Sequence, residues 1–203
     1  MAIPLDPPVY HFSLLAGQVY NDPPDFGAVN SAARAKLYDG GTVLAIRGTD
    51  DLAALKADLE AFTTRTTGLG LLHEGIYEAW EEIEARVLAL DPSPRVLVGH
   101  SEGAALALMA AGSLIRAGKL PQAVYAFEPP RICGDGVLRD LLVGSGSLIY
   151  LTRNGNDLIP MIPTFLDHPA PLVAVGKALQ PLPNLEDHLI VHVQQAFAPA
   201  APA

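Results

Sequence analysis

The chain has 203 residues and a formal net charge of −9, and half of its residues are apolar. This composition excludes a wholly disordered chain, and the acidic charge argues against nucleic acid or an anionic bilayer as the main partner. No uncharged apolar run approaches about 18 residues, so no transmembrane helix and no stable membrane insertion are expected.

Helical and extended patterns alternate in the first half of the chain. In chain order, the sequence predicts a helix over Val9–Tyr20, extended runs over Ala28–Leu37 and Thr42–Ile46 joined by a turn at residues 39–41, a helix over Asp50–Phe62, a loop over residues 63–70 and a helix over Ile76–Leu90.

In the second half, short buried strands alternate with helices. The predicted elements are strands at Arg95–Val98, Val124–Phe127 and Leu148–Leu151, and helices at Ala104–Ile115, Val137–Val143 and Glu186–Phe197. This alternation favours an α/β fold with a mostly parallel sheet flanked by helices. No linker divides the chain, so we expect one domain over residues 1–197 and a flexible tail over residues 198–203.

One motif points to chemistry. Residues 99–103 read GHSEG, between a predicted strand and a predicted helix. A G-x-S-x-G motif in this context places its serine, Ser101, on a sharp turn with the hydroxyl at the carboxyl end of the strand. The helix behind it aims free N–H groups at developing negative charge, which makes the backbone N–H of Glu102 a natural oxyanion donor. The bare motif is common by chance, and the strand–turn–helix context is what favours the catalytic interpretation.

A nucleophilic serine needs a histidine as base and an acid that orients this histidine. In this fold the acid and then the histidine follow the serine along the chain. Asp157 comes just after a predicted strand, where such an acid is expected, and His188 lies in the polar approach to the last helix. His168 is the rival base.

Six short segments occur in one order along the chain: AIRGT at 45–49, HEG at 73–75, GHSEGAALA at 99–107, FEPPRICGD at 127–135, NDLIP at 156–160 and DHL at 187–189. Together they resemble the class 3 lipase family, the fungal-type triacylglycerol lipases with their bacterial and plant relatives. The resemblance implies the α/β-hydrolase fold and a triad of Ser101, Asp157 and His188. It also implies an oxyanion hole formed by the backbone N–H groups of Thr49 and Glu102, without a metal or organic cofactor.

The sequence departs from the family pattern at several positions. Glu102 replaces the usual Leu, Ala104 replaces a Gly, Glu128 stands where the family has Gly, and Val191 takes the place of a Tyr. An acidic group near an apolar pocket is energetically unfavourable, so Glu102 and Glu128 are the two departures that most affect the expected acyl pocket.

The remaining histidines have plainer interpretations. We interpret His73 and His100 as structural hydrogen-bonding residues. His192 lies one turn beyond His188 on the predicted last helix. A pair at this spacing can bind a metal, but no carboxylate set supports such a site.

These features predict a serine ester hydrolase that cleaves acyl lipids or short to medium-chain esters through an acyl-enzyme. A thioesterase or acyltransferase on the same site, and a catalytically silent binding protein, are the alternatives. The segment Asp50–Phe62 is either a mobile lid or a fixed helix, and its acidic composition favours the fixed helix.

The location follows from two weaker signals. The N-terminal MAIPLDPPVYHF has no basic region followed by a long apolar stretch, as a secretory signal would. The only cysteine, Cys133, excludes an intramolecular disulfide and fits a reducing compartment. We therefore expect a cytoplasmic protein, with export by another route left open.

Overall fold

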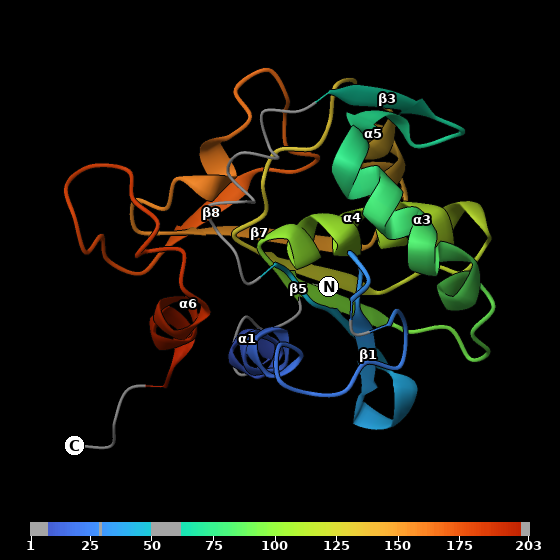
Figure 1. Cartoon of the computed structure of the whole chain (residues 1–203), viewed down its shortest axis with the longest axis horizontal. Coiled ribbons are helices and arrows are strands. Elements are labelled where there is room, and N and C mark those ends of the chain that lie inside the picture. The colour runs from blue at the N-terminus through green and yellow to red at the C-terminus, as the bar shows by residue number, and fades with distance from the viewer. Residues whose placement is uncertain (1–7, 29, 50–61, 200–203) are drawn as a thin grey trace.

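The computed structural model describes residues 8–28, 30–49 and 62–199, and its centre is a six-stranded sheet (Figure 1). The strands lie in the order β1 (Ala35–Tyr38), β2 (Val43–Ile46), β5 (Val96–His100), β6 (Ala123–Phe127), β7 (Leu148–Asn154) and β8 (Leu172–Val175). β1 is antiparallel to β2, and every other neighbouring pair is parallel. The carboxyl ends of the parallel strands therefore meet at one edge, where ligands bind in open α/β sheets.

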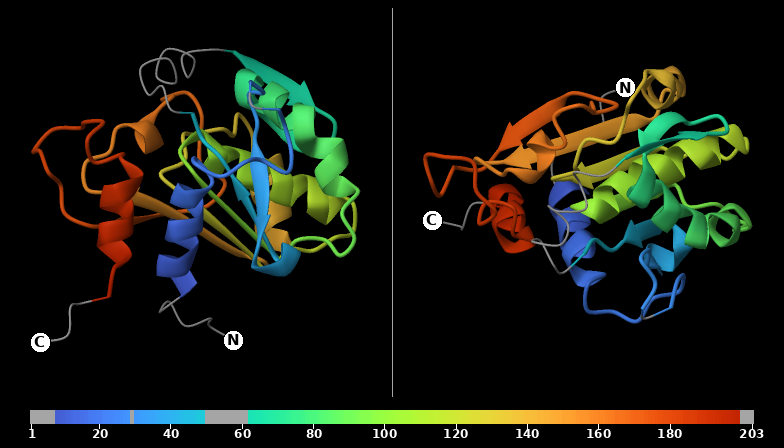
Figure 2. Two further views of the ribbon diagram at one scale, coloured as in Figure 1. Left: turned by 60° about the horizontal axis from the view of Figure 1, so that its bottom comes forward. Right: turned by 45° about the horizontal axis from the view of Figure 1, so that its top comes forward.

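Helices cover both faces of this sheet (Figures 1 and 2). α3 (Glu74–Leu88), α4 (Glu102–Arg116) and α5 (Val137–Gly144) share one buried cluster with the sheet. α1 (Pro8–Gln18) and α6 (Ile190–Phe197) share a second cluster on the opposite face. β2 shows how the pleat divides its side chains: Leu44 and Ile46 belong to the first cluster, Val43 and Ala45 to the second.

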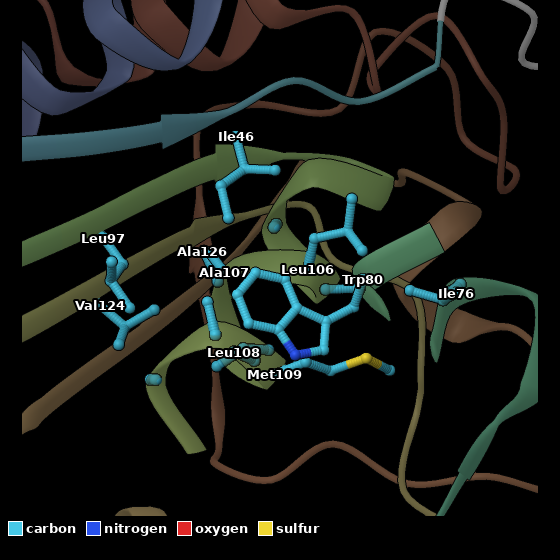
Figure 3. Close-up of a cluster of buried hydrophobic side chains, with 14 of the residues drawn as sticks. Ile46, Ile76, Trp80, Leu97, Leu106, Ala107, Leu108, Met109, Val124 and Ala126 are labelled. Atoms are coloured by element: carbon cyan, nitrogen blue, oxygen red, sulfur yellow. The ribbon is translucent and has the colours of Figure 1, made fainter. Parts of the chain in front are cut away.

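The core around α4 fixes the position of its N-terminus. All residues of α4 from Gly103 to Leu114 are buried, as the apolar run predicts. The Trp80 ring from α3 packs against this helix (Figure 3), and its Nε1–H donates a hydrogen bond of 3.1 Å to the Ser113 hydroxyl. That hydroxyl in turn donates to Glu84, at 2.6 Å. A buried helix held in this way provides a rigid base for the turn that precedes it.

The structure differs from the sequence predictions in three places. The expected loop over residues 63–70 contains β3 (Thr63–Thr66) and the start of β4 (Gly70–His73), which pair as an antiparallel hairpin. β8 was not predicted, because this short edge strand forms only by pairing with β7. α6 begins at Ile190, so His188 precedes the helix and does not share its face with His192.

Two predictions fall on residues that the structure does not describe. Residues 50–61 make up nearly all of the Asp50–Phe62 segment, and residues 200–203 end the expected tail. The choice between a lid and a fixed helix therefore stays open, as does the division into one domain and a tail.

Candidate active site

Ser101 stands on a strained turn between β5 and α4. Its φ of 60° and ψ of −132° lie in a region that non-glycine residues rarely adopt. The flanking glycines allow this turn: a Cβ on Gly99 would lie 2.2 Å from the carbonyl oxygen of Gly103, and a Cβ on Gly103 would lie 2.2 Å from that of Ile46. The sequence therefore builds the strand–turn–helix in which a serine is presented at the carboxyl end of the sheet.

The structure brings Asp157 and His188 to this serine. Oγ of Ser101 lies 2.8 Å from Nε2 of His188, and Oδ2 of Asp157 lies 2.6 Å from Nδ1 of the same ring. All three residues are fully buried. With the proton on Nδ1, the imidazole donates to Asp157 and accepts from the serine hydroxyl, which is the tautomer that a general base needs.

The acid is itself held in place. Its second oxygen, Oδ1, accepts a hydrogen bond of 2.9 Å from the backbone N–H of Ile159, at the start of a short turn that follows β7. The backbone carbonyl of Asp157 accepts from Nε of Arg153, at 3.0 Å. These contacts leave Oδ2 aimed at the imidazole.

Both expected oxyanion donors lie near Ser101. Glu102 follows it in the chain, and Thr49 approaches it through the neighbouring Gly48. Glu102 is the first residue of α4, so its N–H lies in the first turn, at the positive end of the helix. Gly48 packs against Ser101, because a Cβ on Gly48 would lie 3.2 Å from the Cβ of Ser101. Thr49 follows Gly48 directly, so the structure brings its backbone to the same place.

A hydrogen-bonded chain that includes Tyr20 links this backbone to His188. The backbone of Gly48 donates to the Tyr20 hydroxyl, which donates to Nδ1 of His100 at 2.9 Å. Nε2 of His100 then donates to the backbone carbonyl of His188, at 2.8 Å. Burial, then the neighbouring His188, lowers the pKa of His100 well below its usual value, so the ring is neutral and structural. The structural interpretation of His100 fits this position, whereas no pattern in the sequence pointed to Tyr20.

The loop that carries His188 is fastened to the loop that carries Asp157. The Asp187 carboxylate accepts hydrogen bonds from the backbone N–H groups of Asn156 (2.8 Å) and Leu179 (3.0 Å) and from the Asn184 side chain (3.0 Å). Its backbone carbonyl accepts from the Asn154 amide, at 2.8 Å. Asp187, next to the histidine, thus fastens residues 179–187 to the segment 154–156.

The other histidines lie away from the serine. Nε2 of His168 donates to the carbonyl oxygen of Pro160, at 2.8 Å, so this rival base is engaged elsewhere. His192 pairs with Gln195 on its own helix. His73 is the N-cap of α3 and accepts from the backbone N–H of Ile76.

Glu128 is the buried acid that sequence reasoning did not place. It follows β6 with a φ of 55°, it is fully buried, and it lies against the Asp157 carboxyl. Burial, and then the charge of Asp157, raise its pKa well above the usual value. The only signal in the sequence was the departure from Gly at this position.

Comparison with known proteins gives matches to one family of lipases. A family model described as Lipase (class 3) matches residues 43–166. Secreted mono- and diacylglycerol lipase A from Penicillium cyclopium is 32% identical over 136 residues, which cover 62% of this chain and 44% of that protein. Secreted mono- and diacylglycerol lipase 1 from Fusarium solani is 30% identical over 100 residues, 45% of this chain and 29% of that protein. The matched part thus spans less than half the length of these relatives.

Solved structures confirm the α/β-hydrolase fold. The mono- and diacylglycerol lipase from Aspergillus oryzae superposes with a TM-score of 0.66 at 19% identity, covering 86% of this chain and 81% of that one. A Rhizomucor miehei lipase propeptide complex gives a TM-score of 0.64 at 19% identity, covering 82% and 66%.

The comparisons contradict the expected cytoplasmic location, because the curated relatives are named as secreted proteins. The expectation used Cys133, which is buried and free and, as the only cysteine of the 203 residues, cannot form an internal disulfide in any compartment. Its presence therefore carries no information on location. Within the described residues, no helix combines the length and the apolar character needed to cross a bilayer.

Proposed function

The chain belongs to the class 3 lipase family, and from that premise we propose that it is a serine ester hydrolase acting through an acyl-enzyme. The observation that carries the proposal is the buried chain of two short contacts, from Ser101 Oγ to His188 Nε2 and from His188 Nδ1 to Asp157 Oδ2. A hydroxyl held against an imidazole ring, which is in turn held by the side chain of an aspartate, is the arrangement of an activated nucleophile.

The residues then have the following roles. Ser101 attacks the ester carbonyl while His188 takes its proton, and Asp157 orients the ring and offsets the imidazolium charge. The backbone N–H groups of Thr49 and Glu102 stabilise the oxyanion. His188 returns the proton to the leaving alcohol, and water, deprotonated by the same ring, releases the acid.

The substrate class that we propose is an acyl ester of short to medium length, including mono- and diacylglycerols. The names of the relatives support the glycerol esters, and also favour action outside the cell. The charge of residues 50–60 supports dispersed substrates: Asp50, Asp51, Asp58 and Glu60 stand against Lys56 alone, so an anionic lipid surface repels this segment.

We therefore expect the rate on a partly soluble glycerol ester to saturate smoothly below the concentration at which the ester aggregates. The measurement is initial rate against ester concentration, followed through the aggregation point, with the matching thioester as the second arm. A sharp rise only when droplets form would show that the enzyme needs an interface, as a lipase with a working lid does. Faster turnover of the thioester would instead move the assignment to a thioesterase.

A further inference from the structure

Glu128 combines two features that destabilise a folded protein, a strained backbone and a buried acidic side chain. The residue holds a left-handed backbone conformation (φ 55°) and its carboxyl group is fully buried. A non-glycine residue in this conformation is strained, and a buried acid loses its hydration. Glu128 lies close to the proposed triad, because it follows β6, Asp157 follows β7, and these two parallel strands are neighbours.

The contacts of this carboxyl group are few and directed. Oε1 accepts from the Thr152 hydroxyl at 3.0 Å, and Oε2 accepts from the backbone N–H of Asn154 at 2.7 Å. The Asp157 carboxyl is a further neighbour. Among the described residues, Asp157 is the titratable group in contact with Glu128, and His188 lies on the far side of that carboxyl.

We propose that Glu128 is a positioning residue: in its protonated form it donates a hydrogen bond to the Asp157 carboxylate and so limits how strongly this carboxylate stabilises protonated His188. The inference rests on the proposed function, in which Asp157 is the acid of the triad. Two carboxyl groups in contact do not both ionise readily, and burial with the neighbouring Asp157 holds the pKa of Glu128 well above its usual value.

The physical consequence concerns the base strength of the imidazole. A hydrogen bond from neutral Glu128 draws negative charge away from Asp157, so the imidazolium form of His188 gains less from its partner. Activity that depends on this imidazole as a base should therefore extend to a lower pH. Burial and the Asp157 charge outweigh the hydrogen bonds from Asn154 and Thr152 and hold the pKa of Glu128 well above its usual value, which keeps this donor protonated.

The first test is the pH profile of kcat/KM on one soluble ester. Glu128→Gln keeps an N–H donor toward Asp157, whereas Glu128→Gly removes the donor and also relieves the backbone strain. We expect Glu128→Gln to follow the wild-type acidic limb. We expect Glu128→Gly to move the midpoint of that limb up by about one pH unit, the order of shift for one hydrogen bond to a charged group.

Asp39→Gly is the matched control, because Asp39 has a similar positive φ (52°) and its carboxylate is bonded to His11. It should leave the profile unchanged. An unchanged profile in Glu128→Gly would reduce Glu128 to a structural brace between β6 and β7 and overturn the proposal. A shift in Glu128→Gln as large as that in Glu128→Gly would overturn it as well.

The second test measures thermal stability and not activity. Its result can therefore contradict the role of Glu128 even if the chain proves not to be an ester hydrolase. Because the pKa of Glu128 is raised on folding, the folded chain holds a proton that the unfolded chain releases above about pH 4.3. Stability from this group is therefore lost as pH rises from there toward the folded pKa. Glu128→Gln has no such titration. The difference between its Tm and that of the wild type should therefore rise by about 3 to 5 °C per pH unit over this window. A Tm difference that stays constant from pH 5 to 8 would show that Glu128 is not a retained proton donor.

Discussion

Ser101→Ala is expected to lower kcat on a simple ester by about 10⁴-fold or more, because the nucleophile, base and acid act as a unit. The hydroxyl contributes one hydrogen bond to His188 and little packing, so the fold should persist. The residual rate would come from the oxyanion N–H groups and from substrate binding alone. The measurement is steady-state kinetics on a soluble ester, with circular dichroism to verify the fold.

Ser147→Ala is the matched control for this experiment. Its hydroxyl donates to the backbone carbonyl of Pro121 near the amino end of β7, away from the carboxyl edge where Ser101 lies. Activity should stay close to that of the wild type. Near-normal turnover by Ser101→Ala would remove the serine from the mechanism, whatever the geometry around it.

His188→Ala should lose nearly as much activity as the serine variant, on the order of 10⁴-fold in kcat. Without the imidazole, the serine hydroxyl has no base, and the Asp157 carboxylate has no partner at Nδ1. The measurement is again kcat on a soluble ester at a pH where the wild type is fully active.

The controls for the base are the two histidines that the chain order also allowed. His192→Ala should retain wild-type kcat, since its ring contacts Gln195 on α6. His168→Ala should retain most of it, because the ring bonds the carbonyl of Pro160 and not the serine. A dead His168→Ala enzyme beside an active His188→Ala enzyme would reverse the assignment of the base.

The parts of the fold that depend on local patterns could be predicted from the sequence. The apolar run that follows residues 99–103 predicts a buried helix, and α4 is that helix. The alternation of strands and helices predicts the parallel sheet. Asp157 and His188 could be predicted as candidate acid and base because chain order and loop position restrict them, and the structure brings both side chains to Ser101.

The remainder depends on contacts between distant segments. β8 forms only through its pairing with β7. Tyr20 bonds His100 across 80 positions in sequence, and nothing local marks it. Glu128 was visible only as a departure from a family pattern, and its meaning needed the approach of Thr152, Asn154 and Asp157. The location could not be predicted, because a missing signal is not evidence for a compartment.

Covalent labelling tests the central claim most directly. A fluorophosphonate mimics the ester carbonyl and stays bound to an activated serine. After labelling, digestion and mass spectrometry should find the modification on Ser101 alone, and Ser101→Ala should take up no label. Stoichiometric label on another residue, or an active wild-type enzyme that takes up none, would contradict a serine hydrolase mechanism at this site.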